Sequence, residues 1–133
     1  KLDLVGLGSF ADHLPGEISG GMKKRAGIAR ALMLDANLLF FDEPSAGLDP
    51  ISAVELDQLI LTLSQDLGIT VVIVTHELSS IFLVADDCIL LDKQARGIVA
   101  QGDPRKLRDE SRIPFVHNFL TRSSPNEGAN HGG

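Results

Sequence analysis

The chain has 133 residues, with 12 Lys and Arg against 18 Asp and Glu, which gives a formal net charge of −6. A composition of 44% hydrophobic and 23% charged residues is typical of a globular chain and argues against disorder over most of its length. The acidic balance argues against a nucleic-acid-binding surface, which needs clustered Lys and Arg. A single cysteine, Cys88, excludes an internal disulfide, and no apolar run approaches the ~18 residues that cross a bilayer.

The first predicted element is a helix over 20–34, which follows short apolar pieces in residues 1–18. Its apolar face is formed by residues at helical spacing, namely Met22, Ala26, Ala29 and Met33. Ser19 directly precedes it and is a suitable N-cap. The continuous apolar run over 37–41 then predicts a strand that is buried on both faces.

A second helix is predicted over 50–67, because Asp49 is a suitable N-cap and Gly68 a suitable end. Taken by themselves, residues 45–50 are adequately explained as a turn that leads into this cap. The run over 69–75 is rich in β-branched residues and is the clearest strand of the chain.

The rest of the chain predicts shorter elements. Short helices are expected over 77–85, 104–110 and 114–122. Strands are expected over 87–92 and 98–101, joined by a turn near Arg96 and Gly97. The small, polar residues 123–133 predict a disordered tail. The alternation of strands and helices indicates an α/β fold with a mostly parallel sheet and flanking helices.

A serine and two glycines stand at the start of the first helix, in the run Ile18-Ser19-Gly20-Gly21-Met22. Glycines let a ligand or another chain approach the backbone closely. A helix start also presents free N–H groups and the positive end of the helix dipole, which together suit phosphate. The alternative is an ordinary N-cap with a glycine turn, and the five residues alone leave both interpretations open.

Polar side chains follow the two predicted buried strands. Asp42 and Glu43 come after the strand over 37–41, and His76 comes after the strand over 69–75. In open α/β sheets, ligands bind at the carboxyl ends of the strands, where these residues would meet. Asp42 could hold a hydrated Mg²⁺, and Glu43 could activate a water molecule as a general base. The alternatives are two acids in a solvated turn and a histidine with a structural role.

In order and spacing, these segments resemble the C-terminal half of the ATP-binding cassette (ABC) ATPase domain. The matching segments are residues 18–22 for the signature motif, 38–43 for the Walker B motif, 45–50 for the D-loop and His76 for the switch histidine. The fifth signature residue is Met22 where the family usually has Gln. This variant, after Leu14-Pro15, resembles the ATPases of Mla- or Mce-type phospholipid transport. The resemblance covers about residues 1–110.

One part of the family pattern does not occur in the sequence. No G-x-x-x-x-G-K-[ST] motif is present, and this Walker A loop is the one that cradles the phosphates. The resemblance therefore implies a partial P-loop NTPase fold, with residues 1–122 as the C-terminal portion of the ATPase domain. Residues 1–35 would end the helical subdomain, and 36–110 would belong to the catalytic core. We expect a chain that begins with Lys1 to be a piece of a longer protein, inactive as an ATPase by itself.

The resemblance also implies a role for each candidate residue at a site shared by two ATPase protomers. The residues implied to bind ATP are Ser19, Gly20, Gly21, Met22 and Asp49. Asp42 would support the Mg²⁺ ion that accompanies ATP. Glu43 would activate the attacking water, and His76 would contact the γ-phosphate and stabilise its developing charge.

The implied function is that of the ATP-hydrolysing subunit of an ABC transporter, with phospholipid as the substrate of the Mla- or Mce-type subfamily. The implied partners are a transmembrane permease, a second ATPase protomer in a homodimer and lipid-transfer proteins, with no nucleic acid. The implied location is the cytoplasmic face of the cell membrane. Two alternatives remain open: a catalytically silent fragment that binds or regulates a partner, and an ABC ATPase without a role in transport.

Overall fold

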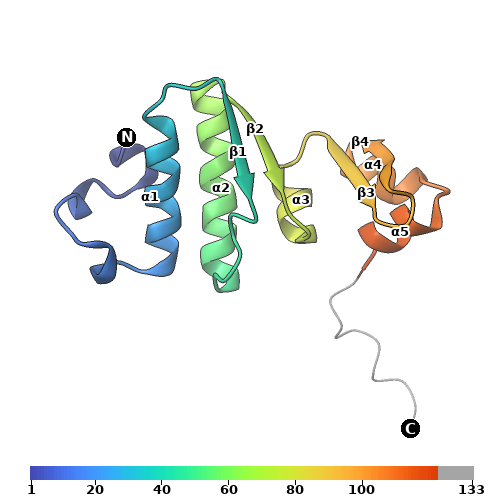
Figure 1. The fold of residues 1–133 in the computed structure, drawn as a ribbon, viewed down its shortest axis with the longest axis horizontal. Helices are drawn as coiled ribbons and strands as arrows, with labels where there is room; N and C mark the ends of the chain where they lie inside the picture. Colours follow the sequence, from blue (N-terminus) through green and yellow to red (C-terminus); the bar gives the residue numbers. More distant parts are fainter. Residues whose placement is uncertain (123–133) are drawn as a thin grey trace, which may run out of the picture. The chain divides into compact units, whose positions relative to one another are not determined.

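The computed structural model describes residues 1–122, and the predicted tail over 123–133 lies outside them. The chain divides into two units after Val84. The first unit (Figure 1) contains the 3₁₀ turns η1 (Asp3–Val5), η2 (Gly8–Phe10) and η3 (Pro15–Glu17), then α1 (Gly20–Leu32), β1 (Leu38–Asp42), α2 (Pro50–Leu67), β2 (Thr70–Val74) and α3 (Leu78–Val84). The described part of the second unit contains β3 (Cys88–Asp92), β4 (Gly97–Gly102), α4 (Pro104–Glu110) and α5 (Pro114–Leu120).

The helices and strands lie where the sequence predicts them, with bounds that differ by at most two residues. Local chemistry accounts for this agreement. The Ser19 hydroxyl accepts a hydrogen bond from the Met22 N–H at 3.2 Å and starts α1. Asp49 starts α2 in the same way, and Gly68 ends α2 with a left-handed φ of 63°. The predicted subdomain boundary between residues 35 and 36 stays a prediction.

The two strands of the first unit run parallel, with Leu38 opposite Thr70 and Asp42 opposite Val74. Parallel strands need a crossover connection, and α2 supplies it. Both strands therefore end at the same edge of the sheet. The residues that follow β1 and β2 meet at this edge, as the sequence predicts.

One face of the strand pair packs against α1 and α2, which lie side by side in Figure 1. The buried residues of this core are Val5, Leu7, Ile28, Ala29, Leu32, Leu39, Leu56, Ile60 and Leu63. The opposite face is apolar but exposed, with Phe40 71% and Val74 60% accessible to solvent. The prediction of a strand buried on both faces is therefore wrong for β1, because both helices cover the same face of the pair.

In the second unit, β3 and β4 form an antiparallel hairpin. The Asp92 carboxylate accepts hydrogen bonds from the N–H groups of Gln94 and Ala95, and Arg96 closes the turn with a φ of 53°. The turn thus falls at the predicted place, and its short length imposes the antiparallel direction. Within residues 1–122, no helix combines the length and apolar character that crossing a membrane would require.

Candidate active site

Asp42, Glu43 and His76, called the edge group below, lie at the carboxyl ends of β1 and β2. The Glu43 N–H donates a hydrogen bond to the Val74 carbonyl at 2.8 Å, and the Glu43 carbonyl accepts one from the Ala46 N–H at 3.1 Å. Between these two bonds the chain turns through a left-handed φ of 45° at Glu43. The backbone of Glu43 is therefore held from both sides. Its conformation is one that residues other than glycine rarely adopt.

The side chains of Glu43 and His76 contact each other across the edge. The Nδ1 atom of His76 lies 2.7 Å from Glu43 Oε1, and the Glu43 side chain is 32% exposed. An ionised carboxylate can only accept, so Nδ1 carries the hydrogen in this contact. The other ring nitrogen, Nε2, lies 3.5 Å from Glu77 Oε1. The imidazole ring therefore lies between two carboxylates.

Asp42 is the last residue of β1 and its side chain is exposed. Among residues 1–122, no group of three His, Cys, Asp or Glu side chains could hold a metal ion. Mg²⁺ commonly binds one or two carboxylates and takes its other ligands from water and substrate phosphates. An exposed carboxylate at the strand end fits that kind of shared site and does not fit a site built from protein alone.

A second set of candidates lies where α1 and α2 begin. This helix-start group consists of Ser19, Gly20, Gly21, Asp49 and Ser52. A Cβ atom on Gly20 would lie 3.7 Å from Leu48 Cδ2, and one on Gly21 would lie 3.8 Å from Ser52 Cβ. The starts of the two helices are therefore neighbours. Both distances are ordinary van der Waals contacts, so packing within the chain would accept alanine at either glycine.

The Asp49 carboxylate is occupied by the cap of its own helix. Its Oδ1 atom accepts hydrogen bonds from the N–H groups of Ile51 and Ser52, at 3.1 and 3.0 Å. Its Oδ2 atom accepts one from the Ser52 hydroxyl at 2.6 Å. These bonds, the one from the Ser52 hydroxyl above all, lower the pKa of Asp49.

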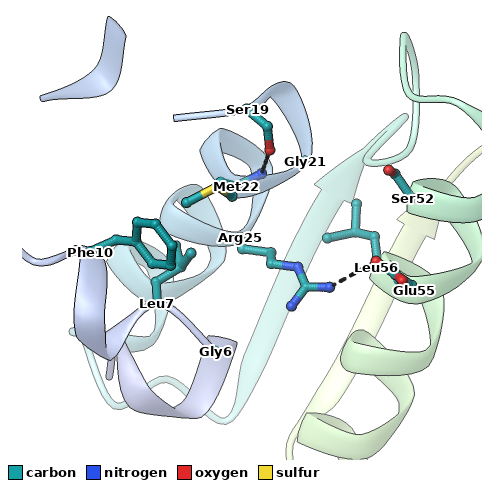
Figure 2. A pocket seen from close by; sticks show the side chains of 10 residues that line it. All are labelled: Gly6, Leu7, Phe10, Ser19, Gly21, Met22, Arg25, Ser52, Glu55 and Leu56. Atoms are coloured by element: carbon teal, nitrogen blue, oxygen red, sulfur yellow. Dashed lines mark hydrogen bonds and ion pairs between the residues drawn. The ribbon is translucent and has the colours of Figure 1, made fainter. Parts of the chain in front are cut away.

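A pocket of about 150 Å³ opens beside the start of α1 (Figure 2). It is lined by Gly6, Leu7, Phe10, Ser19, Gly21, Met22, Arg25, Ser52, Glu55 and Leu56. Arg25 connects three segments here, since its guanidinium donates to the Val5 carbonyl and to Glu55 Oε2, both at 3.4 Å. Met22 packs its side chain against the core, and its N–H is bound to Ser19. Met22 thus forms part of the helix start and presents no free polar group.

The structure therefore gathers the predicted residues into two groups. It joins Glu43 to His76 directly, and it places Gly20 and Gly21 against the residues that flank and bind Asp49. Sequence reasoning missed Ser52 and Glu77. A signal existed for Ser52, because it is the third residue after an aspartate cap, where a hydroxyl can return to the carboxylate.

Comparisons with known proteins find similar sequences and similar folds among ATP-binding proteins of ABC transporters. The profile of the ABC transporter family matches residues 1–46. The probable ribonucleotide transport ATP-binding protein mkl of Mycobacterium leprae is 44% identical over 120 residues, covering 90% of this chain and 34% of that protein. The intermembrane phospholipid transport system ATP-binding protein MlaF of Escherichia coli is 43% identical over 121 residues, covering 90% of this chain and 44% of that protein.

Solved structures show the same fold. The cbiO1 protein of Clostridium perfringens, part of the ABC transporter complex cbiONQ, superimposes with a TM-score of 0.75 at 30% identity, over 90% of this chain and 47% of that one. A dimeric ATP-binding cassette in a post-hydrolysis state, bound to ADP and phosphate, superimposes with a TM-score of 0.62 at 30% identity, over 77% of this chain and 43% of that one.

The fold is α/β and is similar to part of the P-loop NTPase fold of solved ABC ATPase domains. In sequence and fold, the chain is homologous to the ATPase domain of ABC transporters. It spans between a third and a half of the length of the two curated relatives described above.

Proposed function

We propose that this chain contributes the hydrolytic edge and the signature motif of an ABC transporter ATPase. The observation that carries the proposal is the 2.7 Å contact between Glu43 and His76 at the carboxyl edge of the parallel strands. An acid and a histidine that meet there supply a base for water and a donor for phosphate oxygen. Phosphoryl transfer needs little else from protein beyond positioning and charge stabilisation.

Glu43 is the proposed general base. Its carboxylate is partly shielded from solvent, and its backbone is fixed by hydrogen bonds on both sides, so the carboxylate is held in place before a water arrives. It would accept the proton from a water that attacks the γ-phosphate of ATP.

His76 is the proposed donor to the γ-phosphate. Its Nδ1–H is directed to Glu43, so a second hydrogen bond, from Nε2 to a phosphate oxygen, requires the charged imidazolium. That charge would stabilise the negative charge that develops on the transferred group. Asp42 would hold the Mg²⁺ ion, which supplies further charge neutralisation when it is bound with ATP.

The glycines of the helix-start group are proposed to bind ATP held by a second protomer. Glycine inside a helix is destabilising by roughly 0.5–1 kcal/mol relative to alanine. Packing within this chain does not require glycine at Gly20 or Gly21. Close approach of a phosphate to the backbone would require it, and Ser19 adds a hydroxyl at the same place. The predicted ATP contacts of Met22 and Asp49 belong to the same proposal.

The proposed transport system contains a homodimer of this ATPase, a transmembrane permease and lipid-transfer proteins, on the cytoplasmic face of the membrane. Phospholipid is the proposed substrate, and the relative that supports it is MlaF. The mkl protein, named for ribonucleotide transport, is equally similar. Purification of the full-length ATPase with its permease, followed by mass spectrometry of bound lipid, tests the substrate. Recovery of the complex without phospholipid would contradict it.

The proposed hydrolysis is tested by Glu43→Gln in the full-length protein that carries this sequence. Loss of a positioned base is expected to lower kcat by about 10²–10⁴-fold, while ATP binding is retained because the amide keeps the size of the side chain. Glu55→Gln is the matched control, since Glu55 lies outside the edge group and pairs with Arg25. Near-normal hydrolysis by Glu43→Gln would exclude Glu43 as the base.

A further inference from the structure

A buried polar pair joins α2 to α3. Asp57 of α2 is 2% exposed and Ser80 of α3 is 4% exposed. The Ser80 hydroxyl donates a hydrogen bond to Asp57 Oδ2 at 2.5 Å, while Oδ1 of the same carboxylate is buried without a hydrogen-bond partner among residues 1–122. Burial raises the pKa of Asp57, and the bond from Ser80 only partly opposes this.

This pair is an unfavourable way to fill a core. A buried carboxylate with one hydrogen bond loses more hydration than it regains, and an apolar residue of similar size would avoid the loss. On α2, Asp57 stands beside the buried apolar residues Leu56 and Ile60. Asp57 is therefore a carboxylate at a buried position where an apolar side chain would be more stable.

The pair is a buried connection between α3 and α2. Ser80 is the buried residue of this seven-residue helix. So short a helix is marginal on its own, and its position depends on what it packs against. The Ser80–Asp57 bond therefore contributes to holding α3 on α2.

His76 lies in the short segment between β2 and α3. α3 begins two residues after His76, and its first turn is closed by the Ile81 N–H, which donates to the Glu77 carbonyl at 3.0 Å. On the other side, the Glu77 N–H donates to the Thr75 hydroxyl at 3.1 Å. His76 thus lies in a short segment anchored at one end by β2 and at the other by α3.

We propose that Asp57 and Ser80 are a positioning pair that holds the His76 ring against Glu43. The pair touches neither substrate nor the reacting atoms, and it acts through the segment that carries His76. The catalytic consequence rests on the proposed function, whereas the effect on the Glu43–His76 contact does not.

The first test measures ATP hydrolysis by the full-length protein. Asp57→Ala and Ser80→Ala are each expected to lower kcat roughly tenfold, because a displacement of about 1 Å at a reacting group has effects of this order or larger. The KM for ATP is expected to stay unchanged. The double variant is expected to match either single variant, because both remove the same bond. Ser79→Ala, a neighbouring serine that is exposed, is the matched control.

The variant Asp57→Asn distinguishes the positioning of His76 from a general effect on the stability of the fold. Its amide oxygen can still accept from Ser80, so activity is expected to return to the parent value. The second test records the ¹⁵N shift of His76 Nδ1 in the same protein. Asp57→Ala and Ser80→Ala are expected to move it toward its value in Glu43→Ala, whereas Asp57→Asn and Ser79→Ala leave it in place.

The two tests distinguish failure of the proposed function from failure of the pair. If the parent protein lacks hydrolysis but the His76 signal depends on Asp57 and Ser80, the ATPase proposal fails and the positioning pair stands. If Glu43→Gln abolishes hydrolysis while Asp57→Ala and Ser80→Ala keep the parent kcat and the parent His76 signal, the positioning pair is wrong. An equal loss of activity in Ser79→Ala would also overturn it.

Discussion

The edge group and the helix-start group use their polar atoms in different ways. In the edge group, Glu43 and His76 contact each other side chain to side chain, and His76 is 69% exposed. In the helix-start group, Ser19 and Asp49 accept hydrogen bonds from the backbone of their own helices. An exposed ion pair contributes about 0–1 kcal/mol to stability, and a helix cap about 0.5–2 kcal/mol. Changes at the edge should therefore alter chemistry alone, whereas changes at the helix starts alter stability whatever else they do.

After Glu43→Gln, the largest effect on hydrolysis is expected for His76→Ala, which tests the edge side of this comparison. Loss of the donor to the γ-phosphate should lower kcat by about 10²-fold in the full-length protein, with an unfolding free energy within about 1 kcal/mol of the parent. Steady-state hydrolysis and urea unfolding check the two values. An unaltered turnover rate would remove His76 from the mechanism.

Ser19→Asp separates the two roles that a helix-start residue combines. Aspartate caps a helix as well as serine does, so the stability should be unchanged. The added negative charge would repel phosphate at the proposed site, and hydrolysis should fall about tenfold or more. Ser19→Asn is the control, because it caps without charge and should keep activity. Equal activity in Ser19→Asp and Ser19→Asn would show that the phosphate of ATP does not bind beside Ser19.

Asp49→Ala should destabilise the fold, because two backbone N–H groups at the start of α2 lose the carboxylate that accepts their hydrogen bonds. Asp66→Ala, at the other end of the same helix, is the control and should not destabilise. The pKa of Asp49 is lowered in the folded state. The stability that the ionised Asp49 carboxylate contributes is therefore present above its unfolded-state pKa. This stability is lost as pH falls through the folded-state pKa. Urea unfolding should show the difference between variant and parent shrinking in acid.

The smallest effect is expected for the pH dependence of Asp57→Asn. The folded-state pKa of Asp57 is raised by burial, so the folded protein binds the proton more tightly than the unfolded chain does. The parent therefore loses stability as pH rises from the unfolded-state pKa to the folded-state pKa, and the amide does not. Relative to the parent, the variant should gain stability as pH increases over that range. If the difference in unfolding free energy between variant and parent does not change with pH, Asp57 has the same pKa in the folded and unfolded states.

Local signals explain how much of the fold follows from sequence. The bounds of α2 depend on Asp49 at one end and Gly68 at the other, and both act on their own segment. The meeting of Glu43 and His76 follows from one further step, since two strands joined by a helix run parallel and end at one edge. The main candidates for the site could therefore be brought together before any coordinates were known.

The remaining features depend on partners that are distant in sequence. An apolar run predicts burial but does not say what covers each face, so the exposure of Phe40 could not be foreseen. Asp57 and Ser80 are 23 residues apart, and neither forms a motif with its neighbours. The left-handed backbone at Glu43 is equally hidden, because a glutamate gives no local preference for that conformation.

The uncovered apolar face of β1 and β2 exposes the chain to recognition by other proteins. The exposed apolar side chains on this face are those of Leu38, Phe40, Val72 and Val74. Molecular chaperones and proteases act on exposed apolar surface of this kind. Whatever packs on this face shields the chain from both.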